Sequence, residues 1–114
     1  MPSMIIALGS IYVRISNRDR VRELMEATQA AMGAERGCLR YEFAESVVEP
    51  GRFILVQQWE DRAAFDRHYG SQAFTDYQAA IGPYLVRTSD LRVHEADTGV
   101  APFDSDAIPA ALED

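Results

Sequence analysis

One segment restricts the fold more than any other: residues 4–15, MIIALGSIYVRI, are apolar at nearly every position. Such a run predicts a β-strand that is buried on both faces. Residues 53–59, FILVQQW, have the same character over most of their length. A strand with one face in water would alternate apolar and polar side chains instead. The sheet that contains these two strands must therefore be covered on both sides.

A helical pattern follows the first strand. Ser16 or Asn17 can serve as the N-cap, and Gly37 is a natural stop because glycine accepts the left-handed conformation that often ends a helix. Between them runs a stripe of side chains at steps of three and four residues: Val21, Leu24, Met25, Thr28 and Met32. The spacing predicts one amphipathic helix whose stripe faces the core.

A hairpin is predicted next. Residues 39–45 alternate between apolar and polar side chains, and Glu49-Pro50-Gly51 is a turn signal. Residues 53–59 then form the returning strand. The alternation places Gln57 and Trp59 on one face of that strand.

Two short helices and a last strand complete the chain. Asp61 and Ser71 are suitable N-caps for the helices, Gly82-Pro83 ends the second, and residues 90–95 alternate as a strand does. The order β-α-β-β-α-β predicts an α+β protein of the ferredoxin-like type, with a four-stranded antiparallel sheet and its helices on one face. The simplest way to bury the other face of the sheet is to pack it against a second copy of the chain, so we expect a homodimer.

The composition excludes several classes of function. The net charge of −7 argues against nucleic acid or an anionic membrane as partner. All 11 basic residues are arginine, so no lysine can form a Schiff base or act as a general base. Cys38 is the only cysteine, which excludes an internal disulfide and a multi-cysteine zinc site. No membrane-length apolar run and no secretion signal are visible, so we expect a cytoplasmic protein.

The domain boundary is predicted near residue 96. A chain of 114 residues has the size of one domain, and we assign residues 1–96 to it. Residues 97–114 contain two prolines and five acids, and form either an arm that wraps a partner or a frayed tail. The acids are Asp97, Asp104, Asp106, Glu113 and Asp114.

The stretch from Gly37 to Tyr77 carries a family resemblance. It opens with Gly-Cys-Leu-Arg-Tyr at residues 37–41, and the strand 53–59 ends in Gln-Gln-Trp. After that strand come, in order, Ala64, Phe65, His68, Ser71, Phe74 and Tyr77. This ordered combination resembles the antibiotic biosynthesis monooxygenase (ABM) domain over roughly residues 4–95.

The resemblance implies a dimeric α+β barrel of two ferredoxin-like subunits, each with a pocket between its sheet and its helices. Some members of the family oxidise polyketide hydroquinones or anthrones to quinones without flavin, metal or haem. Others degrade haem, isomerise small phosphorylated sugars or oxidise quinols. The family therefore restricts the reaction only loosely.

The chain departs from the family pattern at specific positions. Gln57 stands where the family commonly has a glutamate, and an amide cannot accept a proton at neutral pH. The haem-degrading members have a catalytic tryptophan, a haem-ligand histidine and an asparagine at the positions of His68, Gln78 and Gly9. Because all three are replaced, haem degradation is not expected.

His68 is the candidate catalytic base. An imidazole can accept a proton from a phenol or an anthrone C–H near physiological pH. The alternative is a half-buried histidine that only supports helix packing. His94, on the last predicted strand, should face away from Leu91 and Val93.

The candidate substrate-binding residues are aromatic or amide side chains. Trp59 offers a flat wall for an aromatic ring or, alternatively, packs in the core or at an interface, and Tyr41 offers a hydroxyl donor. Gln57 would position the substrate as a neutral hydrogen-bonding group. Phe74 and Tyr77 have the spacing of core residues, and could line the pocket as well.

Neither a metal-ligand pattern nor a nucleotide-binding motif is present, so we expect no cofactor. The sequence then predicts a monooxygenase in which dioxygen reacts directly with a deprotonated hydroquinone or anthrone. Two alternatives stay open: a dimeric domain that binds a small aromatic or quinone without catalysis, and an isomerase that shuttles a proton.

Overall fold

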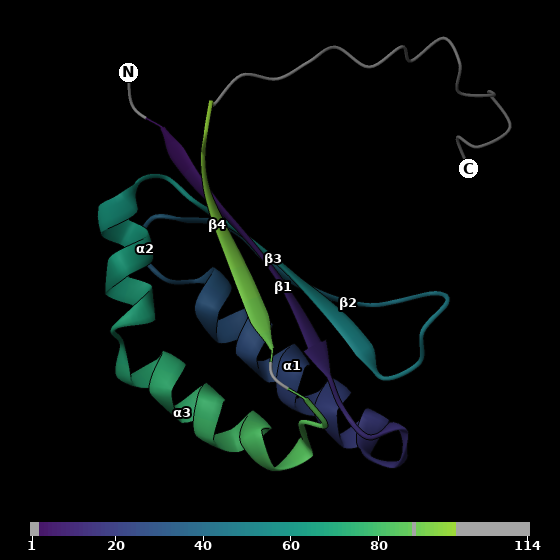
Figure 1. Ribbon diagram of the computed structural model, residues 1–114. Helices are drawn as coiled ribbons and strands as arrows, with labels where there is room; N and C mark the ends of the chain where they lie inside the picture. The colour runs from purple at the N-terminus through teal and green to yellow at the C-terminus, as the bar shows by residue number, and fades with distance from the viewer. Residues whose placement is uncertain (1–2, 88, 98–114) are drawn as a thin grey trace, which may run out of the picture.

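The computed structural model describes residues 3–87 and 89–97, and within them a four-stranded antiparallel sheet carries three α-helices on one face (Figure 1). The strands lie in the order β2-β3-β1-β4. This arrangement confirms the predicted ferredoxin-like α+β fold. In chain order the elements are β1 (Met4–Tyr12), η1 (Ile15–Asn17), α1 (Arg18–Gly33), β2 (Cys38–Glu45), β3 (Arg52–Trp59), α2 (Arg62–Tyr69), α3 (Gln72–Ile81), η2 (Gly82–Tyr84) and β4 (Asp90–Ala96).

Side-chain caps set the starts of α2 and α3, as the sequence predicts, whereas Asn17 at the N-cap of α1 makes no capping hydrogen bond with its side chain. The Asp61 carboxylate accepts a hydrogen bond from the Ala64 N–H at 2.8 Å and begins α2. The Ser71 hydroxyl accepts one from the Phe74 N–H at 3.1 Å and begins α3. Both bonds satisfy backbone donors that have no partner inside the helix.

Two predicted boundaries were wrong. The first strand ends at Tyr12, not residue 15, because the chain turns into the short helix η1 before α1. Helix α1 ends at Gly33, four residues before the predicted stop. Gly37 instead has a φ of 83° in the turn that leads into β2, so its conformational freedom is used there.

The inner face of the sheet, under the helices, holds the core. Side chains of β1 and β3 alternate, and the buried ones on β3 are Phe53, Leu55, Gln57 and Trp59. In the antiparallel register Gln57 lies opposite Ala7, and Trp59 opposite Ile5. Both partners are buried, so this part of β3 is enclosed between β1 and the helices.

The other face of the sheet, called the outer face here, is apolar at its centre. Ile6 and Leu8 of β1 lie opposite Gln58 and Val56 of β3, and Ile54 follows on the same face. These apolar side chains are only partly buried, and Leu8 is 42% exposed. The structure thus confirms that both faces of the central strands are apolar. His94 pairs with Ile6 and so lies on the outer face, which is the side away from Leu91 and Val93, as predicted.

The domain boundary near residue 96 stays a prediction. Strand β4 ends at Ala96. The predicted arm, residues 97–114, lies outside the described residues except for Asp97. Among the residues that the structure describes, no helix is long and apolar enough to cross a membrane.

The turn at Gly37 gives a test of the fold. A Cβ at residue 37 would lie 2.6 Å from the Ala64 Cβ, and the positive φ would strain any L-residue. We expect Gly37→Ala to lower the free energy of unfolding by about 2 kcal/mol in urea denaturation. Gly33→Ala is the matched control, because a Cβ there meets nothing within 4 Å. It should be neutral or stabilise by up to about 1 kcal/mol; equal losses in both variants would contradict the steric argument.

Candidate functional site

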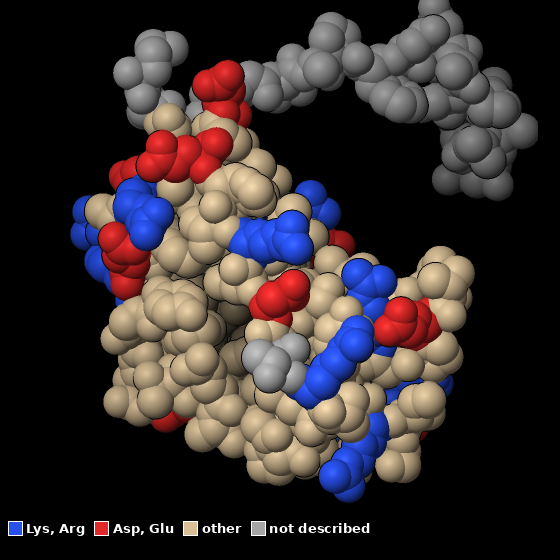
Figure 2. Space-filling model, viewed as in Figure 1, with Lys and Arg blue, Asp and Glu red and all other residues tan. Residues whose placement is uncertain are grey.

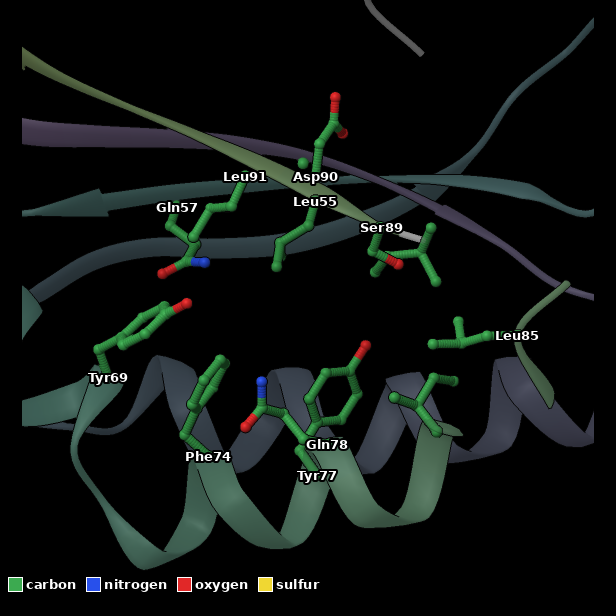
Figure 3. Close-up of a pocket in the computed structure, with 13 residues that line it drawn as sticks. Leu55, Gln57, Tyr69, Phe74, Tyr77, Gln78, Leu85, Ser89, Asp90 and Leu91 are labelled. Carbon is green, nitrogen blue, oxygen red and sulfur yellow. The ribbon is translucent and has the colours of Figure 1, made fainter. Parts of the chain in front are cut away.

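A cavity of about 460 Å³ lies between the sheet and α3. Figure 2 shows the molecule hollowed there, and Figure 3 shows side chains of the sheet above the cavity and of α3 below it. The residues that line it are Gly9, Ile11, Leu55, Gln57, Tyr69, Phe74, Tyr77, Gln78, Ile81, Leu85, Ser89, Asp90 and Leu91. Gly9 cannot be enlarged easily, because a Cβ there would lie 2.9 Å from the carbonyl oxygen of Asp90.

The lining is apolar or uncharged. Among the described residues, the one exception is Asp90, which is formally charged. Its side chain points away from the cavity (Figure 3), and its Oδ1 accepts a hydrogen bond from the Ser10 N–H at 3.2 Å. Among the described residues, the cavity therefore presents aliphatic and aromatic carbon together with neutral amide and hydroxyl groups.

Gln57 brings an amide into the cavity from β3. Only 1% of the residue is exposed, and its Oε1 accepts a hydrogen bond from the Trp59 indole N–H at 2.9 Å. The bond forms because residues two apart on a strand share a face. The amide nitrogen lies on the cavity side (Figure 3).

Tyr77 brings a hydroxyl into the cavity from α3. The residue is 8% exposed, and its side chain points from α3 toward the sheet (Figure 3). Among the described residues, the buried hydroxyl has no hydrogen-bond partner. Burial raises the pKa of Tyr77 above its ordinary value, so the hydroxyl keeps its proton at neutral pH.

His68 is buried behind the cavity and held on several sides. Its Nδ1 lies 3.1 Å from Oε2 of Glu35, in the turn before β2, and its ring stacks on Trp59 with centroids 4.7 Å apart. If Nδ1–H donates to the carboxylate, Nε2 carries the lone pair. Among the described residues, Nε2 is buried without a partner.

Burial lowers the pKa of His68, and the hydrogen bond to Glu35 opposes this shift. The imidazole is therefore neutral at pH 7. Glu35 reaches the surface, because 25% of its side chain is exposed whereas the His68 side chain is fully buried. The pair links a buried ring to solvent.

Tyr41 completes an aromatic cluster around His68. Its ring meets the imidazole edge-on at a centroid distance of 5.3 Å. Burial raises the pKa of Tyr41, and no described residue pairs with its hydroxyl. Phe74 packs against His68 from the other helix, with centroids 5.1 Å apart.

The structure divides the predicted site residues into two groups. Gln57, Phe74 and Tyr77 line the cavity. His68, Trp59 and Tyr41 are instead clustered beside it, and none of them is in the lining. Phe74 belongs to both groups, since it lines the cavity and contacts His68. Their catalytic and binding roles stay predictions.

Sequence reasoning missed Glu35 and most of the lining residues, including the polar side chains of Tyr69, Gln78 and Ser89. Glu35 precedes the Gly37 turn, but nothing in the sequence connects it with a histidine 33 residues later. Tyr69 does carry a signal, because it adjoins His68 on a helix whose face turns inward.

Metal ligation has no evident place in this arrangement. In residues 3–87 and 89–97, no group of three His, Cys, Asp or Glu side chains converges as metal ligands do. Cys38 is a free thiol, and burial raises its pKa, which makes it a weaker nucleophile. The expectation that the reaction needs no cofactor stays a prediction.

Comparison with known proteins identifies relatives across most of the chain. The Mycobacterium tuberculosis protein named "Putative monooxygenase Rv0793" is 31% identical over 104 residues, which cover 91% of this chain and 96% of that protein. Its solved structure superposes with a TM-score of 0.73 and covers 90% of this chain and 97% of its own.

A protein from Deinococcus radiodurans has a similar fold. Its crystal structure, described as that of a "putative antibiotic biosynthesis monooxygenase", superposes with a TM-score of 0.81 at 22% identity. The match covers 87% of this chain and 98% of that one. The family model for antibiotic biosynthesis monooxygenases matches residues 4–80. The chain therefore belongs to the antibiotic biosynthesis monooxygenase (ABM) family.

Proposed function

We propose that the protein is a monooxygenase that oxidises a small aromatic hydroquinone or anthrone in the cavity without metal or flavin. The observation that carries the proposal is an uncharged, largely apolar cavity of about 460 Å³ beside a buried, neutral His68. Family membership and the names of the relatives favour a monooxygenase. A cavity of this size and polarity suits a small aromatic molecule.

The chemistry for an anthrone starts with proton loss. A base removes one proton from the methylene carbon, and the resulting anion gives one electron to dioxygen. The two radicals combine into a peroxide anion at that carbon, and the protonated base returns its proton to give the hydroperoxide. Loss of water then leaves a carbonyl, so one oxygen atom enters the product and the other leaves as water with the two methylene hydrogens. A water-poor cavity protects these intermediates.

We assign His68 as the base, acting through Nε2, with Glu35 as the positioning residue that holds Nδ1. Phe74 lines the cavity and contacts the imidazole. We therefore propose that the substrate reaches Nε2 past the Phe74 ring, which must turn aside. Trp59 is assigned to orient the imidazole, Tyr41 to donate a hydrogen bond, and Gln57 to position the substrate.

One alternative is a domain that binds an aromatic or quinone without catalysis. It is favoured by the absence of His68 from the cavity lining and by an amide at residue 57. An isomerase acting on phosphorylated sugars is less well supported, because the lining among the described residues offers no cationic side chain for a phosphate.

We also propose that two copies of the chain pack outer face to outer face. Support comes from the apolar centre of that face, where Leu8 is 42% exposed and Ile6, Ile54 and Val56 are only partly buried. Burying this area would be favourable, and a two-fold pairing makes the surface its own complement.

Oxygen uptake tests the proposed reaction. Purified protein with chelator should consume dioxygen in the presence of an anthrone or a hydroquinone, and His68→Ala should reduce the rate at least roughly 100-fold. Glu35→Gln should cause a smaller loss. His94→Ala is the matched control, because that histidine is on the opposite face of the sheet. Uptake unchanged in His68→Ala would exclude His68 as the base, and saturable ligand binding without uptake would favour the binding domain.

The dimer is tested by measuring molar mass. Leu8→Glu places a carboxylate at the centre of the outer face, and we expect analytical ultracentrifugation to show a shift from dimer to monomer. Ala31→Glu makes a similar change on the exposed side of α1, across the sheet, and should leave the dimer intact. A wild-type monomer at tens of micromolar, or a dimer in Leu8→Glu, would contradict the proposal.

Acid should destabilise the protein through His68. Because the pKa of folded His68 is lowered, the unfolded chain binds a proton between that pKa and about 6.5 that the folded chain does not bind. Stability from this group is complete above about 6.5 and falls with pH through that window, by at most about 1.4 kcal/mol per pH unit. Urea denaturation at fixed protein concentration should show a steeper loss for wild type than for His68→Gln. Equal slopes would refute the buried, neutral imidazole.

A further inference from the structure

The hydrogen bond between Trp59 and Gln57 fixes which way the Gln57 amide faces. An indole N–H can only donate, so the atom that it contacts at 2.9 Å must be the amide oxygen. With Oε1 engaged in this way, the NH₂ group is left for the cavity side, where Figure 3 shows the nitrogen. Gln57 therefore offers the cavity a donor.

Tyr77 offers a second donor from the opposite wall. Its hydroxyl is more than nine-tenths buried, points into the cavity and has no partner among the described residues. A buried donor without a partner costs free energy, which a ligand with a suitably placed acceptor would recover. The Gln57 amide on β3 and the Tyr77 hydroxyl on α3 are both donors, so each would pair with an acceptor atom on the ligand.

The electrostatics of the cavity also restrict the charge that a ligand can carry. No ionised side chain among the described residues points into the cavity, since the Asp90 carboxylate faces away. An anionic ligand would lose its hydration without gaining a counter-charge. The rings of Phe74, Tyr69 and Tyr77 and the aliphatic side chains around them instead favour a flat, uncharged molecule.

We propose that the cavity selects an uncharged ring compound by its carbonyl oxygen, which accepts a hydrogen bond from the Gln57 amide, and that the Trp59 indole determines this selectivity by holding the amide. Tyr77 is available to a second oxygen on the ligand. The inference rests on the proposed function, from which the class of substrate is taken. It adds that the protein binds the substrate in its ketone form.

The same contact would assist deprotonation. When the C–H bond of a bound anthrone breaks, the proton goes to the base and the electron pair spreads onto the carbonyl oxygen. A donor already at that oxygen stabilises the charge as it develops. The amide therefore binds the neutral substrate, and binds its anion more strongly.

The test measures binding without turnover. Dissociation constants are measured by NMR titration of the wild-type protein with α-tetralone, with tetralin, which has the same rings and no oxygen, and with naphthoate, which is anionic. We expect α-tetralone to bind roughly 10-fold more tightly than tetralin, and naphthoate to bind more weakly than either. The Gln57 side-chain NH₂ resonances should shift with α-tetralone and not with tetralin.

Variants separate the polarity of residue 57 from its charge. Gln57→Met removes the donor without adding charge and should bring the ratio of the two dissociation constants to about one. Gln57→Glu should weaken α-tetralone binding. Gln78→Glu is the control, because it adds a charge to the same cavity; it should retain the preference for α-tetralone over tetralin. Trp59→Phe should reduce the preference while leaving tetralin binding unchanged, and provides the test if a Gln57 variant does not fold.

Two results would overturn the inference: an unchanged preference in Gln57→Met or Trp59→Phe, or tighter wild-type binding of naphthoate than of α-tetralone. The outcome is independent of the oxygen-uptake experiment. If the protein prefers α-tetralone but consumes no dioxygen, the inference about the cavity stands and the proposed monooxygenase activity is refuted. If it consumes dioxygen but shows no such preference, only the inference is refuted.

Discussion

The alternation of side chains along β3 is the constraint on which the site depends. It puts Phe53 and Leu55 into the core and then, on the same face, Gln57 and Trp59. Because these last two residues share a face, the indole can bond the amide and at the same time stack on His68. A shift of register by one residue would send all four to the outer face and separate Trp59 from His68. Strand β3 thus contributes side chains to both the cavity and the histidine cluster.

Most of the fold could be predicted from the sequence because its signals are local. Continuous apolar runs predicted β1 and β3, and period-two runs predicted β2 and β4. Asp61 and Ser71 predicted the starts of α2 and α3, where these caps bond backbone amides. The ends of β1 and α1 were harder, because glycine is compatible with both a helix stop and a turn. Gly37 has the positive φ of a turn, while α1 ends earlier, at Gly33.

The site was predictable only in part because its geometry depends on long-range contacts. Helical spacing placed Phe74 and Tyr77 on an inward face, and the structure puts both in the cavity lining. The partner of His68 could not be predicted, since Glu35 is distant in sequence and is brought near by the turn before β2. Nor does spacing tell which inward residue reaches a cavity and which one packs behind it, as His68 does.

The partial exposure of Glu35 has a consequence for the proposed reaction. The imidazole is closed off from water, whereas its carboxylate partner reaches the surface of the molecule. In the proposed reaction a proton taken up at Nε2 makes the ring a buried cation, and the partly exposed Glu35 carboxylate at Nδ1 supplies its counter-charge while the substrate occupies the cavity. The proton then returns from Nε2 to the bound peroxide, so the proposed base would be restored for the next cycle without water being admitted to the reacting molecule.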